Sequence, residues 1–236
     1  MTEYIRNNVE AVRREIAAAE ACVGRTGQTA MLAAVKYALP GEIEALIEAG
    51  VSDVGENRVQ QLLANAPIYE NRSVRVHFIG TLQTNKVKYI IDKVDVIHSL
   101  DSERLALEIE KRAAAKGRTV DVLVEINSGR EESKTGVLPE QALALCRLVL
   151  TLPHLHLCGF MTMGPVCESE AEYRQYFAST VALGKELWST LGLDGAPKFS
   201  MGMSQSFAAA IKEGATWIRV GRGLFAGRPE PTTVSE

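Results

Sequence analysis

The sequence predicts an α/β fold: a single (β/α)8 barrel, or TIM barrel, with an extra N-terminal helix. Its 236 residues are 46% hydrophobic and 23% charged, which suits one large domain, because barrels of this kind often have about 200 to 250 residues. Short apolar runs typical of strands recur eight times, and helical patterns separate nearly all of them. This alternation indicates parallel strands joined by right-handed crossovers. Eight such units can close into a barrel, whereas an open sheet usually stops at about six strands.

The first predicted element is a helix that precedes every strand. Apolar residues recur there at alternating spacings of four and three, which places them on one stripe of a helix; they are Ile5, Val9, Val12, Ile16, Ala19 and Val23. We expect residues 1–24 to form this helix within a single domain spanning residues 1–236, because no linker-like segment divides the chain. Residues 228–236, with Pro229 and Pro231, are predicted to be a flexible tail.

The eight predicted strands then follow in order, and the second and seventh are the shortest. They lie at residues 31–36, 53–55, 74–79, 94–98, 120–127, 155–160, 199–200 and 217–220. Helical patterns between them lie at residues 41–49, 58–64, 102–116, 139–150, 170–191 and 204–212. Each strand is therefore expected to end at the same rim of the barrel, where the active sites of such folds are found.

Composition excludes several classes of partner. The formal net charge is -3, and Lys and Arg alternate with Asp and Glu, so the chain offers no basic surface for nucleic acid. Its first residues carry charge where a signal peptide needs an apolar run, and no segment approaches the ~20 apolar residues of a membrane span. We therefore expect a cytoplasmic protein that does not bind membranes.

The four cysteines form no CxxC pair and are predicted to be reduced thiols in the core: Cys22, Cys146, Cys158 and Cys167.

Lys36 is the sharpest candidate for chemistry, because it ends the apolar strand MLAAVK. Burial there disfavours the charged ammonium form and leaves a nucleophilic amine, which can form a Schiff base with an aldehyde. The alternative is a lysine that extends to the rim or pairs with a carboxylate.

Two glycine-rich segments, SMGMSQSF and WIRVGRGLFAG, follow the seventh and eighth strands. Loops at these positions commonly bind phosphate through backbone N–H groups. Glycines 202, 221 and 223 are placed for this role, with the hydroxyl groups of Ser200 and Ser204 as further donors. The alternative is that the glycines only allow tight turns. The spacing in GRGLFAG does not match a dinucleotide-binding fingerprint.

Arg219 and Gly221 are two residues apart, so both can face the inside of the barrel. An inward arginine can donate to a ring nitrogen of a ligand or form a salt bridge within the barrel. No metal site is predicted: His154 and His156 share a strand face but precede its site end, and His77 and His98 have no Cys or His at ligand spacing.

Seven blocks of sequence in order resemble one known family, the pyridoxal-phosphate homeostasis proteins of YggS/PROSC type. The blocks are AAVKY around residue 36, DVGENRVQ at 53–60, HFIGTLQTNK at 77–86, EESKTG at 131–136, GFMTMGP at 159–165, SMGMSQSF at 200–207 and IRVGRGLFAGRP at 218–229. Together they span almost the whole chain. The resemblance implies the barrel of the alanine racemase, fold-type III pyridoxal 5′-phosphate (PLP) enzymes, without their second β domain.

The resemblance also implies roles for individual residues. Lys36 matches the lysine that forms the internal aldimine with PLP, and Asn57 matches a residue lining the cofactor. Arg219 matches the arginine facing the pyridine nitrogen. Ser200, Ser204 and Gly221 fall in the family's phosphate cup.

The sequence departs from the family pattern at three positions, where Val35, Arg222 and Ser206 stand in place of hydroxyl-bearing or acidic residues. Arg222 either adds a charge-assisted bond to the phosphate or points to solvent while its backbone N–H serves the phosphate. His77, Gln83, Asn85 and Lys86 are expected to shape the open cofactor face or a partner surface.

The function implied is a monomeric PLP-binding protein of intracellular vitamin B6 homeostasis that passes the cofactor to recipient apoenzymes and has no robust catalytic activity. An arginine beside the ring nitrogen leaves that nitrogen unprotonated, which makes the ring a weak electron sink. The resemblance also implies that the second acid/base tyrosine, which related racemases place outside the barrel, is absent. Alternatives are a PLP-dependent amino-acid racemase, an aldolase that uses the lysine without PLP, and a protein-binding module.

Overall fold

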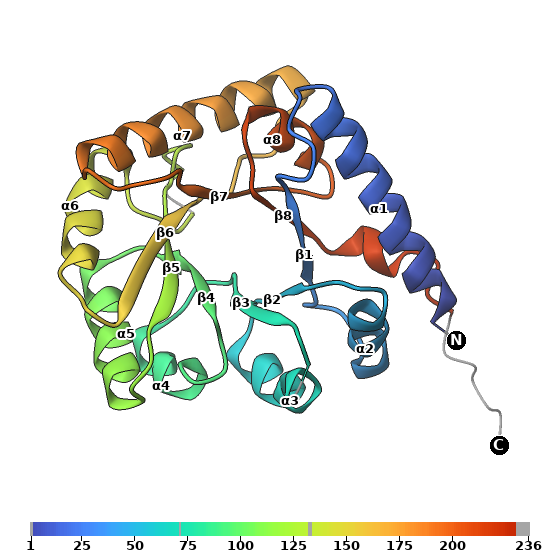
Figure 1. Ribbon diagram of the computed structural model, residues 1–236, viewed down its shortest axis with the longest axis horizontal. Helices are drawn as coiled ribbons and strands as arrows, with labels where there is room; N and C mark the ends of the chain where they lie inside the picture. The colour runs from blue at the N-terminus through green and yellow to red at the C-terminus, as the bar shows by residue number, and fades with distance from the viewer. Residues whose placement is uncertain (1, 71, 132–133, 230–236) are drawn as a thin grey trace.

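Eight parallel strands pair in sequence order and close into a barrel, because β8 also pairs with β1 (Figure 1). The computed structural model describes residues 2–70, 72–131 and 134–229. The strands are β1 (Ala30–Ala34), β2 (Asp53–Glu56), β3 (Arg75–Phe78), β4 (Val96–Leu100), β5 (Val120–Glu125), β6 (Leu155–Met161), β7 (Lys198–Met203) and β8 (Trp217–Val220). All eight predicted strands are confirmed, including the two short ones.

Helices surround the barrel and cover the outer faces of the strands. They are α1 (Glu3–Ala21), α2 (Pro40–Glu48), α3 (Val59–Tyr69), α4 (Val87–Ile90), α5 (Glu103–Ala115), α6 (Pro139–Leu150), α7 (Glu170–Thr190) and α8 (Phe207–Glu213). Two short 3₁₀ helices, η1 (Thr84–Lys86) and η2 (Arg222–Phe225), follow β3 and β8. The predicted (β/α)8 barrel with an additional N-terminal helix is confirmed.

Helix α1 occupies the position that a helix after β8 has in a regular barrel. In the described part of the chain, which ends at residue 229, β8 is followed only by η2, and α1 packs between α8 and α2 to complete the ring (Figure 1). Its predicted apolar stripe is buried from Ile5 to Ala19, whereas Val23 lies beyond the helix and is exposed. The stripe predicted from spacing therefore packs onto the barrel.

The helices differ most from the sequence prediction in three places. The connection between β3 and β4 contains η1 and α4, which are too short to produce a helical period. Helix α3 continues through Pro67 to Tyr69 instead of ending at residue 64. Helix α8 begins at Phe207 and not at Ser204, because Ser206 closes a turn in which its Oγ accepts from the N–H of Met203.

The molecule has two apolar clusters, one on each face of the sheet. The larger lies between the strands and the helices, and the smaller fills the barrel interior with Leu32, Ile79, Val96, Leu123, Met161 and Trp217. Polar side chains share this interior and are buried: Asp53, His77, His98, Glu125, Ser200 and Arg219. Because side chains of a strand alternate between faces, these residues are those that the pleat directs inward.

All four cysteines are free, but the prediction that they are core thiols is wrong for two of them. Cys22 follows α1 at the surface and is exposed, and Cys167 is half-buried in the loop after β6 and belongs to neither apolar cluster. Cys146 is buried, and burial raises the pKa of its thiol to about 12. Such a thiol is a weak nucleophile at neutral pH.

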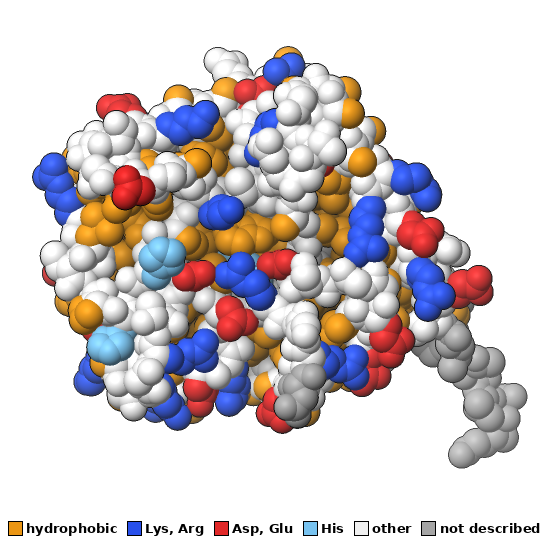
Figure 2. Space-filling model, in the orientation of Figure 1, with side chains coloured by type: hydrophobic (Ala, Val, Ile, Leu, Met, Phe, Trp, Pro, Cys, Tyr) orange, Lys and Arg blue, Asp and Glu red, His pale blue; other side chains and the backbone are white. Residues whose placement is uncertain are grey.

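Acidic and basic side chains are interspersed over the face shown in Figure 2. Among the described residues, no helix combines the length and apolar character that crossing a bilayer requires. Of the predicted flexible tail, residues 230–236 lie outside the described part of the chain, and the single domain over residues 1–236 stays a prediction.

Candidate functional site

A cavity of about 330 Å³ opens at the rim where the strands end, beside the tips of β1, β7 and β8. Of the residues predicted to hold the ligand, seven line this cavity: Lys36, Asn57, Gly202, Ser204, Arg219, Gly221 and Arg222. Ser200 and Gly223 do not line it. The C-terminal ends of parallel strands meet at one rim, which is why residues so far apart in sequence come together here. A cavity of this size suits a small ligand.

Lys36 follows β1 and is half-buried at the cavity wall. Among the described residues, no carboxylate lies within ion-pair distance of its amino group, and its Nζ is 4.9 Å from the ring centroid of Tyr37. The alternative of a structural salt bridge therefore finds no support in the described part of the chain. The amine stays available to a ligand.

A second cavity, of about 480 Å³, adjoins the first and shares Lys36 and Asn57 with it. Lys134 and the buried Glu125 also line this space. Burial raises the pKa of Glu125, although Thr135 Oγ1 donates to its Oε1 at 2.7 Å. Lys36 thus lines both spaces.

Arg219, on β8, is buried and held from two sides. Its Nη1 donates to the carbonyl oxygen and to Oγ of Ser200, both at 2.8 Å, and its Nη2 donates to the carbonyl of Thr162 at 2.9 Å and approaches Met163 Sδ at 3.2 Å. Burial lowers its pKa to about 10, which leaves the guanidinium charged at neutral pH. Its Nε–H has no partner among the described residues, so this one donor remains for a ligand in the cavity.

The loops after β7 and β8 present free backbone donors to the cavity. Among the described residues, no hydrogen bond uses the backbone N–H of Ser204 or Gln205 after β7, or of residues 221–223 after β8. Gly202 allows the first loop to turn, because its φ is +86° and a Cβ there would lie 2.6 Å from Ala210 Cβ. Converging N–H groups of this kind form an anion-binding cup.

Arg222 and Asn57 flank the cup and the lysine. The Arg222 side chain is exposed at the cavity mouth and has no ion-pair partner among the described residues. Asn57 follows β2, where the chain passes so close to Gly80 that a Cβ at residue 80 would lie 2.2 Å from the Asn57 carbonyl oxygen. Only glycine at position 80 permits this approach, which fixes where Asn57 enters the cavity.

Ser200 lies beneath the cavity instead of in its wall. Its side chain is fully buried, and its Oγ contacts Arg219 and, at 2.9 Å, Nδ1 of His98. Its assignment to a phosphate cup stays a prediction, but its observed contacts are all within the barrel. Two departures from the family pattern are structural as well: Val35 is fully buried, and Ser206 closes the turn after β7.

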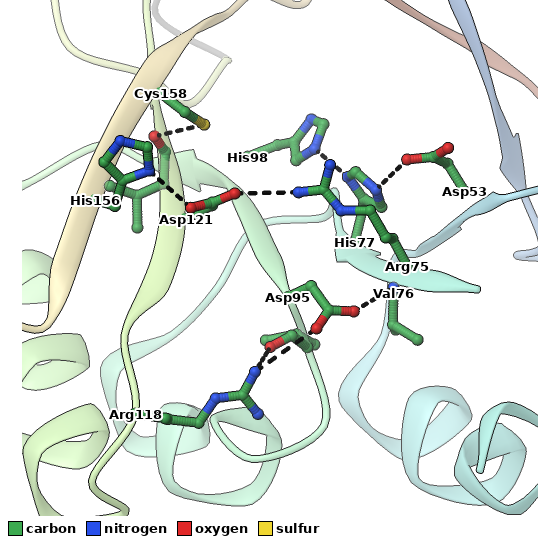
Figure 3. A network of polar contacts seen from close by, with 12 residues as sticks. Asp53, Arg75, Val76, His77, Asp95, His98, Arg118, Asp121, His156 and Cys158 are labelled. Atoms are coloured by element: carbon green, nitrogen blue, oxygen red, sulfur yellow. Dashed lines mark hydrogen bonds and ion pairs between the residues drawn. The ribbon is translucent and has the colours of Figure 1, made fainter. Parts of the chain in front are cut away.

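Sequence reasoning missed the residues beneath Arg219. His77, expected at the open face, is fully buried, and its Nδ1 lies 2.8 Å from His98 Nε2 (Figure 3). Its Nε2 lies 2.8 Å from Asp53 Oδ1. The signal that could have found them is period two: His77 lies two residues before the inward Ile79, and His98 two residues after the inward Val96.

Comparison with known proteins agrees with this site. The family model for the alanine racemase N-terminal domain matches residues 5–229. Similar curated proteins include the pyridoxal phosphate homeostasis proteins of Aquifex aeolicus, 43% identical over 84% of this chain and 86% of the relative, and of Helicobacter pylori, 36% identical over 95% and 99%. The chain belongs to the pyridoxal phosphate homeostasis family of alanine racemase N-terminal domains. The resemblance seen in the sequence is thereby confirmed.

Solved structures have the same fold. A structure described as that of an unknown protein from Bifidobacterium adolescentis is 36% identical, with a TM-score of 0.87 over 95% of both chains. PipY of Synechococcus elongatus PCC7942, solved with PLP bound, is 28% identical, with a TM-score of 0.82 over 94% of this chain and 99% of PipY. Alanine racemase of Clostridium difficile is 17% identical, with a TM-score of 0.73, and 59% of its length is covered, so it shares the fold alone.

Proposed function

We propose that the chain binds PLP in the 330 Å³ cavity, covalently through Lys36, and acts in intracellular vitamin B6 homeostasis. One observation carries the proposal: an amine without an ion-pair partner among the described residues shares the cavity with an arginine N–H donor and a cup of free backbone N–H groups. PLP presents an aldehyde, a ring nitrogen and a phosphate, which are the partners that these three elements select. The homeostasis proteins related to this chain, and PipY with PLP bound, support it.

Each element has a distinct role in holding the cofactor. When bound, PLP supplies an aldehyde that condenses reversibly with amines. Lys36 provides the amine, Arg219 donates its Nε–H toward the ring nitrogen, and the N–H groups of residues 204–205 and 221–223 bind the phosphate. Asn57 borders the ring between Lys36 and the second cavity. Arg222 adds a positive charge at the phosphate end.

The environment of Arg219 supports binding more than catalysis. A charged guanidinium can donate a hydrogen bond to the ring nitrogen but does not protonate it, so the ring withdraws electrons weakly. We therefore infer no robust catalytic activity. If incubation with amino acids in D₂O exchanged their Cα hydrogens at enzyme-like rates, the racemase alternative would be favoured instead.

We further propose that the protein is a monomer inside the cell and passes PLP to recipient apoenzymes. Lys36 lines two adjoining cavities, so an incoming amine can approach the lysine from the cavity that the bound cofactor does not fill. Transfer can be measured by mixing the PLP-loaded protein with an apoenzyme and following the recovery of that enzyme's activity. Recovery no faster than with the same concentration of free PLP would contradict direct transfer.

The test of PLP binding is an absorbance titration followed by borohydride reduction and peptide mapping. We expect a new band on addition of PLP and a pyridoxyl group on Lys36 after reduction. Lys36→Ala should lose both, whereas Lys185→Ala, at an exposed lysine of α7 remote from the cavity lining, should keep both. Absence of the band in the unaltered protein, or modification at another lysine, would contradict the proposal.

A further inference from the structure

A chain of hydrogen bonds crosses the barrel interior from the cavity floor to the opposite end. At the cavity floor, Arg219 Nη1 lies 2.8 Å from Ser200 Oγ, and Ser200 Oγ lies 2.9 Å from His98 Nδ1. The chain continues from His98 Nε2 to His77 Nδ1, and from His77 Nε2 to Asp53 Oδ1, each 2.8 Å (Figure 3). Asp53 is the first residue of β2, at the end of the barrel away from the cavity. The chain thus connects the candidate ligand donor with a distant carboxylate.

The direction of the bonds in this chain follows from its carboxylate end when both imidazoles are neutral. An ionised carboxylate can only accept, so His77 donates from Nε2 to Asp53. Nδ1 of a neutral His77 then accepts from His98 Nε2, and Nδ1 of a neutral His98 accepts from Ser200 Oγ. A guanidinium can only donate, so Ser200 Oγ also accepts from Arg219. Both neutral histidines therefore carry their proton on Nε2.

The surroundings of the chain favour this protonation state. Burial lowers the pKa of His77, although Asp53 opposes the effect, and burial together with His77 and Arg219 lowers the pKa of His98 well below its usual value. Hydrogen bonds from His77 and Ser52 keep the pKa of Asp53 low despite its burial. The remaining charged groups that act on the histidines are Arg75 and Asp95. Trp217 packs against both imidazoles, with ring centroids 5.3 and 5.6 Å away.

Arg219 needs such a chain because it lacks a direct counterion among the described residues. Its η nitrogens contact only two carbonyl groups, one hydroxyl group and one sulfur atom. A buried charge without compensation is costly. Hydrogen bonds in series polarise one another, so a carboxylate at the far end makes the Ser200 hydroxyl a better acceptor for Arg219.

We propose that Asp53, His77 and His98 are positioning residues that act through Ser200 to hold Arg219 with its Nε–H directed at the cofactor ring. The role of these three residues toward the cofactor rests on the proposed function, whereas the donor–acceptor direction of the hydrogen bonds does not. The cofactor affinity is therefore set partly by a carboxylate at the opposite end of the barrel. This extends the site to residues that line neither cavity.

The direction of the chain is tested on the cofactor-free protein by ¹⁵N NMR of the histidine side chains. Four histidines are present, and His154→Gln and His156→Gln each remove one signal, so the two signals that remain belong to the buried rings. We expect His77 and His98 to be neutral Nε2–H tautomers throughout about pH 6 to 8. A proton on Nδ1 of either buried ring, or a charged ring in this range, would overturn the proposal.

The action on the cofactor is tested by a double-mutant cycle on PLP affinity. Asp53→Asn removes the charge but keeps an acceptor for His77, and we expect PLP to bind about threefold to tenfold more weakly. Ser200→Ala interrupts the chain next to Arg219 and should weaken binding about tenfold. In the Ser200→Ala background, Asp53→Asn should have no further effect. Effects that multiply independently would mean that Asp53 only stabilises the barrel.

Asp92→Asn is the matched control. Asp92 pairs with Lys93 and Lys116 ahead of β4, at the same end of the barrel, but it is not among the charged groups that act on either histidine. It should leave PLP affinity unchanged, and an effect as large as that of Asp53→Asn would overturn the proposal. If the unaltered protein bound no PLP, the proposed function would fail while the NMR result still stood. If it bound PLP but the cycle showed no coupling, this inference alone would fail.

Discussion

At the residue scale, Arg222 is the departure from the family pattern with the clearest consequence. Its side chain is exposed, lines the cavity and has no ion-pair partner among the described residues. Arg222→Ala is expected to weaken PLP binding about threefold to tenfold, because a charge-assisted contact to phosphate is lost from a partly solvated position. Arg147→Ala removes the same charge from an exposed position on α6 and should leave the dissociation constant unchanged. Equal affinities for both variants would mean that only the backbone N–H of residue 222 serves the phosphate.

Glu56, next to Asn57, controls a different property, the pH dependence of stability. It is fully buried; its Oε1 accepts from Asn65 at 2.8 Å and from Tyr69 at 2.6 Å, while Oε2 has no partner among the described residues. Burial raises its pKa, so the unfolded chain loses this proton at a lower pH than the folded protein does. Its contribution to stability is therefore lost as pH rises from the unfolded pKa through the folded one.

Glu56→Gln removes the ionisable group. The gain in unfolding free energy of this variant over the unaltered protein should therefore be larger at pH 8 than at pH 5. Urea denaturation of both proteins at the two pH values gives the comparison. The exposed Glu70→Gln provides the control and should show no such gain. A difference in unfolding free energy that does not change with pH would contradict a raised pKa at Glu56.

At the element scale, the turn between β7 and α8 depends on one glycine. Gly202→Ala places a Cβ 2.6 Å from Ala210 Cβ in a residue whose φ is +86°, and we expect a loss of about 2 kcal/mol or more in unfolding free energy. PLP affinity should also fall, since the N–H groups of Ser204 and Gln205 follow directly. Gly195→Ala has a φ of +72° but no atom within 4 Å. It should cost about 1 kcal/mol and leave PLP affinity unchanged.

The helices and strands of the barrel could be predicted from the sequence where their hydrophobic pattern was long enough to show a period. The order of the eight strands and the stripe of α1 follow from local spacing, and the cavity-lining residues follow from the rule that strand ends share a rim. The short α4 carries no period. The partnership of His77 with His98 depends on how β3 and β4 stagger within the closed barrel, which the sequence alone does not specify.

Ser200 illustrates the same limit. It was grouped with Ser204 because both lie in one glycine-rich block, yet the pleat of β7 buries Ser200 inside the barrel and leaves Ser204 at the rim. The sequence block identified the correct segment, β7 and the loop after it. The alternation of side chains along β7 decides that Ser200 points into the barrel, and the sequence block does not show this.

At the scale of the whole molecule, PLP binding and folding are expected to be coupled. A ligand that binds only the folded state adds about 2.7 kcal/mol of stability at a concentration 100 times its dissociation constant. Denaturation with and without PLP should show this gain in the unaltered protein and little of it in Lys36→Ala. For a monomer the midpoint should also be independent of protein concentration, so a midpoint that rises with concentration would contradict the proposed oligomeric state.

The packing of α1 links the two ends of the chain. Asn8 donates from Nδ2 to the carbonyl groups of Leu224 and Ala226, at 3.1 and 2.9 Å, and so ties the first helix to the segment that carries Arg222. During synthesis the first 21 residues are made long before this partner segment emerges from the ribosome. The wall of the cavity formed by β8 and η2 is accordingly completed only after residue 226 has been synthesised, so a nascent chain contains Lys36 well before it contains this wall.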